Sequence, residues 1–301
     1  MVKNMIEPTE KVWTDEELKS EIKRMKMSMC ESTPTTLQIQ QVGTEMYLDT
    51  EEGKVRILAY NLDNPQPLPL FVNIHGGGFV LGKAESDDPF MMNIADNANV
   101  KIINIDYSLA PDYPFPKALN ECYAVIRYAK EHWQEFNIDP DNIAVGGHSA
   151  GGNLSAAICL LDYERKVLGI KSLILDYPPM DVYTDAGLKN QPKEAIPIPI
   201  CRLFDACYCN DKEARKNPLI SPIYAAPEQL SSFPPTLVIT ASRDSLCQEA
   251  EKFKDMLVMA GVDVTHKRFD AEHGFNMNHS PEARESWKLM INHLKRTLWD
   301  K

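Results

Sequence analysis

Short apolar runs alternate with helix-like segments along most of this chain. Alternation of this kind is typical of βαβ units, in which helices join parallel strands. Leu173-Ile174-Leu175 and Leu237-Val238-Ile239 are apolar without a break, which suits strands covered by helices on both faces. The sequence therefore predicts an α/β protein built on a parallel sheet. The strand-like runs fall at residues 55–60, 70–74, 101–107, 143–145, 172–176, 236–240 and 264–269.

The pentapeptide Gly147-His148-Ser149-Ala150-Gly151 follows the run at 143–145 and precedes a helix-like stretch. A serine between a strand and a helix can occupy a strained turn with its hydroxyl exposed. Glycines two residues away on either side, here Gly147 and Gly151, let the strand and the helix pass close together. Ser149 is therefore the candidate nucleophile, although the pattern alone also fits an ordinary turn.

A glycine-rich segment, His75-Gly76-Gly77-Gly78-Phe79, directly follows the run at 70–74. Consecutive glycines leave backbone N–H groups uncovered, and two such donors can hold the oxyanion of a tetrahedral intermediate. The alternative is a flexible turn. We favour an oxyanion-binding loop because the segment precedes the candidate nucleophile in the chain. His75 is expected to shape this loop by hydrogen bonding.

Two further candidate residues follow the last two strand-like runs. Asp244 comes after residues 236–240, and His273 comes after residues 264–269. The order serine, acid, histidine is that of one known type of catalytic triad and differs from the order in the two well-known protease folds. Asp244 could also cap the helix that starts near Ser245, and the two roles are compatible.

Together these motifs resemble those of the hormone-sensitive-lipase family of α/β-hydrolases, specifically its microbial carboxylesterases. The resemblance covers roughly residues 55–295 and rests on five motifs in the family's order. It implies an α/β-hydrolase fold with a mostly parallel eight-stranded sheet, flanking helices and a helical cap over the site. The motifs are His75-Gly76-Gly77-Gly78-Phe79, Tyr107-Ser108-Leu109-Ala110-Pro111-Asp112, Gly147-His148-Ser149-Ala150-Gly151-Gly152, Ser242-Arg243-Asp244 and His273-Gly274-Phe275.

The resemblance also implies roles for individual residues. Ser149 would be the nucleophile, His273 the general base and acid, and Asp244 the residue that orients His273. The backbone N–H groups of Gly77, Gly78 and Ala150 would form the oxyanion hole, with His75, Gly76, Gly147 and Gly151 in support. No cofactor and no metal are implied.

Two departures from the family pattern stand out. The residue before the nucleophile is usually acidic or small in this family, and here it is His148. We hypothesise that its side chain points away from the substrate and supports a nearby loop, so that aspartate in its place would leave substantial turnover. An arginine and a glutamate of the family are replaced by Ser108 and Asp112, so a buried ion pair is absent or rebuilt.

The N-terminal segment predicts an amphipathic helix. Thr14-Asp15-Glu16-Glu17 is a capping box, and Leu18, Ile22, Met25 and Met29 follow at helical spacing. This apolar stripe either covers the core or, as the resemblance implies, belongs to the cap. We expect residues 1–50 to form N-terminal cap helices and residues 181–222 a cap insertion. Residues 51–180 and 223–301 would form the catalytic core.

Within the cap insertion, Ile196-Pro197-Ile198-Pro199-Ile200 is expected to break regular structure before the run at 201–209. Cys201, Cys207 and Cys209 cluster there but lack the paired spacing and the nearby histidine of a zinc site. Small apolar packing residues in a helix are the preferred interpretation.

Composition narrows the range of partners and locations. The net charge of −11 argues against nucleic acid or an anionic membrane surface, since both require clustered cations. No apolar segment approaches the roughly 18 residues of a membrane span, and we expect a cytoplasmic protein with reduced cysteines. A homodimer through cap helices or edge strands is an open alternative to a monomer.

The predicted function is a serine carboxylesterase acting on a small-molecule ester. The resemblance implies short acyl chains, from acetyl to about hexanoyl. One alternative is an arylformamidase or another small amide or peptide hydrolase with the same triad. Another is a non-catalytic receptor for a small molecule, although receptors of this fold lose the triad histidine, which is present here as His273.

Overall fold

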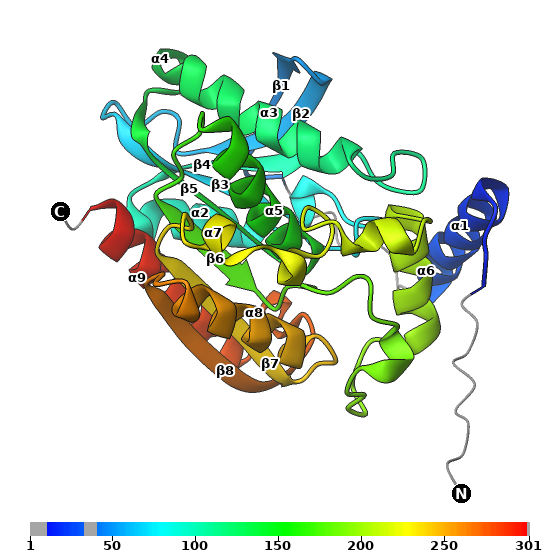
Figure 1. Ribbon diagram of the computed structural model, residues 1–301. Coiled ribbons are helices and arrows are strands. Elements are labelled where there is room, and N and C mark those ends of the chain that lie inside the picture. The colour runs from blue at the N-terminus through cyan, green and yellow to red at the C-terminus, as the bar shows by residue number, and fades with distance from the viewer. Residues whose placement is uncertain (1–10, 33–40, 300–301) are drawn as a thin grey trace, which may run out of the picture.

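A single twisted sheet crosses the molecule, with helices on both of its faces (Figure 1). The structure, a computed structural model, describes residues 11–32 and 41–299. The strands are β1 (Thr44–Thr50), β2 (Gly53–Tyr60), β3 (Leu68–Ile74), β4 (Lys101–Asp106), β5 (Ile138–His148), β6 (Ser172–Asp176), β7 (Thr236–Arg243) and β8 (Val264–Glu272). The α-helices are α1 (Asp15–Ser32), α2 (Asp88–Ala98), α3 (Lys117–Glu131), α4 (Trp133–Phe136), α5 (Ala150–Arg165), α6 (Ile198–Tyr208), α7 (Pro227–Leu230), α8 (Cys247–Met259) and α9 (Pro281–Leu298).

The sheet has eight strands in the order β1-β2-β4-β3-β5-β6-β7-β8. The pairs β1–β2 and β2–β4 are antiparallel, and every other neighbouring pair is parallel. The predicted mostly parallel eight-stranded sheet is therefore confirmed. Its central strands β3, β5, β6 and β7 all run in one direction, so the loops that follow them meet at the same edge.

The first strand corrects one predicted boundary. β1 lies within residues 1–50, which we assigned to the cap, yet it pairs with β2 from Thr44 to Thr50. Only Leu48 on this strand is buried, while most of its other residues are exposed. An edge strand with one covered face carries too few apolar residues to stand out in the sequence. The sheet therefore begins before residue 51.

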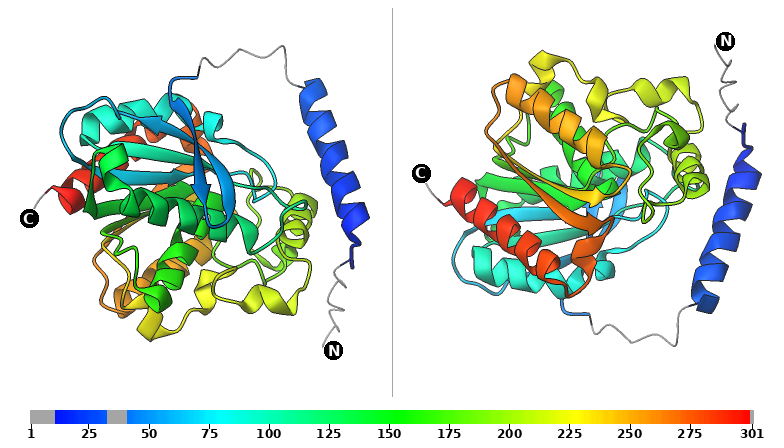
Figure 2. Two further views of the ribbon diagram at one scale, coloured as in Figure 1. Left: turned by 90° about the horizontal axis from the view of Figure 1, so that it is seen from above. Right: turned by 90° about the horizontal axis from the view of Figure 1, so that it is seen from below.

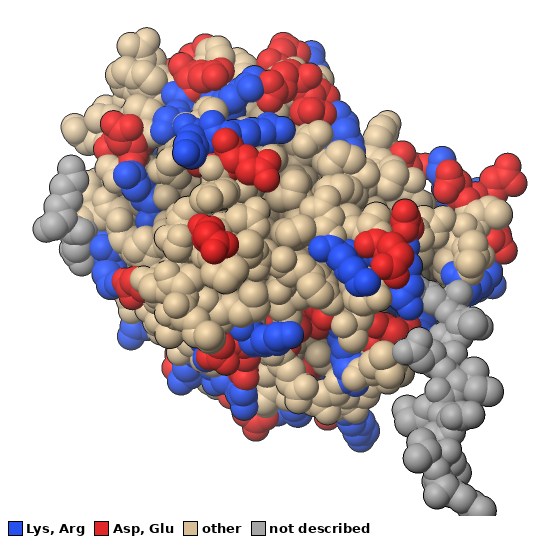
Figure 3. Space-filling view, viewed as in Figure 1, with Lys and Arg blue, Asp and Glu red and all other residues tan. Residues whose placement is uncertain are grey.

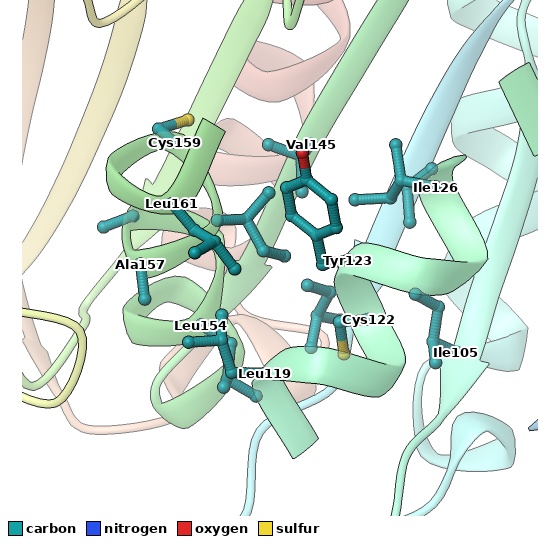
Figure 4. Close-up of a cluster of buried hydrophobic side chains, with 14 of the residues drawn as sticks. Ile105, Leu119, Cys122, Tyr123, Ile126, Val145, Leu154, Ala157, Cys159 and Leu161 are labelled. Atoms are coloured by element: carbon teal, nitrogen blue, oxygen red, sulfur yellow. The ribbon is translucent and has the colours of Figure 1, made fainter. Parts of the chain in front are cut away.

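Side chains of the central strands alternate between two apolar layers. Leu70, Val72 and Ile74 of β3 point into one layer, and Phe71 points into the other. Helices α3, α5 and α8 cover the first layer, and α2 and α9 cover the second. Figure 4 shows part of the first layer, where side chains of α3 and α5 meet over the sheet; its labelled residues are Ile105, Leu119, Cys122, Tyr123, Ile126, Val145, Leu154, Ala157, Cys159 and Leu161.

Helices α1 and α6 lie side by side at one end of the molecule, and we call these two helices the cap helices (Figures 1 and 2). Leu18 and Ile22 of α1 are buried against Leu203, Ala206 and Cys207 of α6. Met25 packs at the edge of this cluster, whereas the side chain of Met29 lies outside the described residues.

The ends of the cap helices agree only in part with prediction. The capping box of α1 is confirmed, because the Thr14 N–H donates to Glu17 Oε2 at 2.8 Å and the Glu17 N–H donates to Thr14 Oγ1 at 3.2 Å. The prolines of residues 196–200, by contrast, start a helix: α6 begins at Ile198, directly after Pro197. Proline is tolerated in a first helical turn, where its missing N–H has no partner to lose.

Charges of both signs are interspersed over the face of the molecule seen in Figure 3. Within residues 11–32 and 41–299, no helix is long and apolar enough to cross a membrane.

A buried carboxylate joins the start of the sheet to α2. Asp88 accepts hydrogen bonds from the N–H groups of Val42 (2.6 Å) and Gly43 (2.9 Å) and from the Tyr60 hydroxyl (2.6 Å). Asp88→Ala would leave these three donors without their acceptor, so we expect the free energy of unfolding to fall by about 3 kcal/mol or more. Urea unfolding measures this change. Tyr60→Phe removes one of the three bonds and should cost about 1 kcal/mol; equal losses in the two variants would contradict the account.

Candidate active site

Ser149 occupies a sharp turn between β5 and α5. Its backbone has φ 54° and ψ −124°, a strained conformation for a residue with a side chain. The Ser149 N–H donates to the carbonyl of Asp176 at 2.8 Å. A Cβ atom at Gly147 or Gly151 would come within 2.2 or 1.8 Å of the Ile74 carbonyl oxygen. The turn therefore requires glycine at both predicted positions, as the sequence motif indicated.

Three side chains from the ends of three parallel strands form one hydrogen-bonded chain. His273 Nε2 lies 2.9 Å from Ser149 Oγ, and His273 Nδ1 lies 2.7 Å from Asp244 Oδ2. Because an ionised carboxylate only accepts, the proton sits on Nδ1, and Nε2 is left to accept the serine proton. The second oxygen of Asp244 accepts the Leu246 N–H at 3.0 Å, so this carboxylate also caps the turn into α8.

The glycine-rich loop after β3 lies beside the serine. A Cβ atom at Gly76 would meet the His148 ring at 2.8 Å and Ser149 Cβ at 3.3 Å. The carbonyl of Gly77 accepts the N–H groups of Val80 and Leu81, which folds the loop into a tight turn. Within the described residues, the N–H groups of Gly77, Gly78 and Ala150 make no hydrogen bond. They are thus available to an oxygen of a ligand.

His75 is buried beneath this loop. Its ring stacks on Tyr107 at a centroid distance of 4.2 Å, and its Nδ1 lies 2.7 Å from the carbonyl of Gly76. Burial lowers the pKa of His75, so the ring is neutral at physiological pH. These contacts agree with the predicted role of His75 in shaping the loop.

His148 points away from Ser149 and into a buried polar cluster. Its Nε2 lies 3.1 Å from Asp87 Oδ1, and the Asp87 carboxylate is fully buried. Burial acts to lower the pKa of His148, but the charge of Asp87 and the contact with it outweigh burial, so the pKa is raised. The hypothesis that His148 supports a nearby loop agrees with its packing against Gly76. Sequence reasoning did not find Asp87.

Asp176 at the end of β6 is the second buried acid of this cluster. Burial raises the pKa of Asp176 to about 8. Its Oδ2 accepts from the amide of Asn276, and the Tyr177 hydroxyl donates to the oxygen of the same amide. The backbone carbonyl of Asp176 accepts the Ser149 N–H and so holds the turn of the candidate nucleophile. Asp176 therefore connects the buried cluster to that turn. The sequence signal that could have revealed Asp176 is an acidic residue at the end of an apolar strand run.

Ser108 and Asp112, where the resemblance predicts that a buried ion pair is absent or rebuilt, make two separate contacts. The N–H and hydroxyl of Ser108 donate to the Glu121 carboxylate at 2.7 and 2.8 Å. Asp112 is exposed and pairs with Lys19 of α1 at 3.3 Å. One contact supports the loop after β4, and the other reaches the cap.

A small, partly enclosed cavity of about 50 Å³ lies beside Ser149. Its walls are mainly apolar, with a polar end formed by side chains of opposite charge. Lys189 there pairs with Glu249 at 2.6 Å. The lining residues are Gly78, Phe79, Ser149, Pro179, Asp181, Ala186, Lys189, Ile196, Cys201, Phe204, Asp205, Ser245 and Leu246.

The cysteines near the cap are free thiols in this structure, as are the other cysteines whose side chains are described. Burial raises the pKa values of Cys201 and Cys207 to about 12, so both stay protonated at neutral pH. In the described part of the chain, no group of three or more His, Cys, Asp or Glu side chains could hold a metal ion.

Comparison with known proteins places this fold and site in a family. A family described as the alpha/beta hydrolase fold matches residues 71–277. Since this match spans more than half of the 301 residues, the chain belongs to that family. The resemblance to its hormone-sensitive-lipase branch of microbial carboxylesterases is confirmed.

Several relatives carry esterase names. The chain is 31% identical over 262 residues to an arylesterase of Saccharolobus solfataricus, covering 85% of this chain and 83% of the relative. It is 31% identical over 258 residues to the carboxylic ester hydrolase LipN of Mycobacterium tuberculosis, covering 82% and 68%. A crystal structure of carboxyl esterase 2 from the mycorrhizal fungus Tuber melanosporum superposes with a TM-score of 0.80 at 27% identity, covering 89% and 90%.

The buried cluster changes our expectation for His148→Asp. An aspartate there would face the fully buried Asp87 and Asp176 without a cation. We expect the free energy of unfolding to fall by about 3 kcal/mol or more, whatever the turnover of the folded fraction. Urea unfolding of this variant tests the loss. The exchange variant Asp87→His with His148→Asp restores an opposite-charge pair and should recover part of it; no recovery would argue against the pairing.

The same cluster predicts a pH dependence of stability. The folded-state pKa of His148 is raised, so its contribution is complete below the unfolded value near 6.5 and is lost as pH rises through the folded value. Asp176 keeps its proton up to about pH 8 in the folded chain but loses it near pH 3.8 in the unfolded chain. Between these two values the free energy of unfolding therefore falls as pH rises.

Relative to an Asp176→Asn variant, wild-type stability should therefore fall from pH 4 to pH 8. Urea midpoints across this range measure the difference. Parallel curves for the two proteins would show that Asp176 titrates normally.

Proposed function

We propose that this chain is a serine carboxylesterase that cleaves short-chain acyl esters through an acyl-enzyme. Its family and the names of its relatives support the reaction class. The observation that carries the mechanism is the hydrogen-bonded chain from Ser149 through His273 to Asp244. In such a chain a serine hydroxyl can lose its proton as it attacks.

In the first half of the reaction, Ser149 Oγ bonds to the ester carbonyl carbon while its proton passes to His273 Nε2. The carbonyl oxygen becomes an oxyanion held by the N–H groups of Gly77, Gly78 and Ala150. Each such donor contributes about 3 kcal/mol to lowering the barrier. The carbon–oxygen bond to the alcohol then breaks, and His273 returns the proton to the departing alcohol.

In the second half, water takes the place of the alcohol. His273 removes a proton from the water as its oxygen bonds to the acyl carbon, and then protonates Ser149 Oγ as the acid leaves. Asp244 holds the imidazole in the tautomer that accepts at Nε2 and stabilises its cation.

The cavity beside Ser149 supports the short acyl chain. The cavity is small, about 50 Å³, and its walls are mainly apolar. This space suits acyl chains from acetyl to about hexanoyl, with the shorter ones fitting best. The walls formed by Phe79, Pro179 and Leu246 would contact such a chain.

Ser149→Ala should reduce turnover of p-nitrophenyl esters by at least about 10⁴-fold, because the variant cannot form the acyl-enzyme. Hydrolysis of a ladder of esters from acetate to laurate measures this effect and the preferred length. A fluorophosphonate should add covalently to the wild type, seen by mass spectrometry, and not to the variant.

Asp244→Asn serves as a second variant, since it keeps the shape of the side chain but favours the wrong tautomer of His273. It should lower kcat by about 10⁴-fold. Turnover unchanged in both variants would overturn the serine mechanism. Parallel assays with a formamide separate ester from amide hydrolysis.

A further inference from the structure

Phe204 of α6 lies directly over the loop that carries the free N–H groups. A Cβ atom at Gly78 would come within 2.1 Å of its ring, so the ring occupies the space that only a glycine leaves open. Gly78 also has φ 61°, which disfavours a side chain for a second reason. The cap and the oxyanion loop are therefore in contact through this ring, in addition to the stacked rings of Phe79 and Tyr208.

The same ring lines two separate spaces. One is the partly enclosed cavity of about 50 Å³ beside Ser149. The other is an open groove of about 1210 Å³ between α1 and α6. Phe204 is the residue common to the two linings. It thus stands as a wall between a small space that includes the serine and a large one that does not.

We propose that Phe204 is the residue that sets substrate specificity by dividing the acyl cavity from a groove for the alcohol. The substrates are then esters that join a small acyl group to a bulky, largely apolar alcohol. This inference rests on the proposed esterase function and names its substrate class.

The assignment of the two spaces follows from the order of the reaction. The acyl group stays bonded to Ser149 Oγ after the first half, so it belongs in the space that the serine lines. The alcohol must leave before water attacks, so it requires the open side. The groove has an apolar floor, which includes Trp13, Leu81 and Leu203, and a charged rim, which includes Glu21 and Arg24. An apolar alcohol fits this floor.

The packing of the cap explains why Phe204 faces the site. Leu203, Ala206 and Cys207 are fixed in the buried cluster with Leu18 and Ile22 of α1. Phe204 follows Leu203 and is turned about 100° around the helix from it. With the neighbouring face of α6 held by α1, the Phe204 ring is directed toward Gly78.

Two isomeric esters test the assignment with the wild-type protein. Octyl acetate and ethyl octanoate have the same atoms, but the long chain is in the alcohol of one and in the acyl group of the other. We expect kcat/KM for octyl acetate to exceed that for ethyl octanoate by about tenfold or more. Preference for ethyl octanoate, or cleavage of p-nitrophenyl acetate but of neither isomer, would overturn the proposal.

Phe204→Ala tests the wall itself, because it removes the side chain that the linings of the cavity and the groove share. The variant should raise kcat/KM for p-nitrophenyl octanoate relative to acetate by about tenfold. Ile200→Ala is the matched control: it removes an apolar side chain one helical turn away that lines the groove and not the cavity. It should keep the wild-type order of acyl lengths. An unchanged order in Phe204→Ala would contradict the proposal.

Phe204→Trp keeps the inference testable if the smaller side chain weakens the cap. A larger ring should narrow the cavity and restrict turnover further toward acetate. Circular dichroism and thermal unfolding check that each variant is folded. A wild type that cleaves no ester refutes the proposed function, whereas a wild type that cleaves short esters with no response to either Phe204 variant refutes only this inference.

Discussion

The strained backbone of Ser149 is the constraint on which the rest of the site depends. A φ of 54° is maintained because the Ser149 N–H bonds to the carbonyl of Asp176 on the neighbouring strand. It is also maintained because Gly147 and Gly151 allow the turn to press against the end of β3. That close approach brings the glycine-rich loop, which continues from β3, next to the serine. Nucleophile and N–H donors are thus positioned by the same contact.

Beneath this turn lies a layer of buried polar side chains, where most protein cores have apolar ones. Asp87, His148 and Asp176 are buried, and leaving any one of them without its partners would be costly. Asn73 extends the layer by donating to Asp87 and to Asn104, both buried. Because these side chains sit below two of the loops that form the site, the layer holds the loops in position. His148, which pairs with Asp87, is the position at which the sequence motif was expected to depart from the family pattern.

Features carried by local patterns could be predicted from the sequence. The hydrogen-bonded chain of Ser149, His273 and Asp244 could be predicted because each residue follows a recognisable strand, and the carboxyl ends of parallel strands meet. The glycines around Ser149 are required by contacts of the backbone alone, so their spacing was sufficient. The capping box of α1 was equally local.

Features that depend on distant parts of the chain were missed or misplaced. β1 was not predicted because it has a single buried residue, Leu48, and one apolar position does not indicate a strand without the pairing to β2. The partner of His148 lies far away in the sequence, and nothing around Asp87 marks it as a counter-ion. Phe204 could not be singled out because its contact with Gly78 depends on how the distant glycine-rich loop folds. Prolines near residue 198 were read as breaking structure, although at a helix start they are tolerated.

The proposed division of the site by Phe204 has a consequence for how an acyl-enzyme would partition between water and alcohol. In the proposed arrangement the acyl group lies in the cavity beside Ser149, so the departing alcohol and the incoming water share the groove between α1 and α6. An alcohol that lingers there excludes water and can take the acyl group back, which reforms the ester. The local concentration of the bulky alcohol, rather than the chemistry at Ser149, then decides between hydrolysis and acyl transfer. In the presence of a second alcohol the same protein would act as a transacylase.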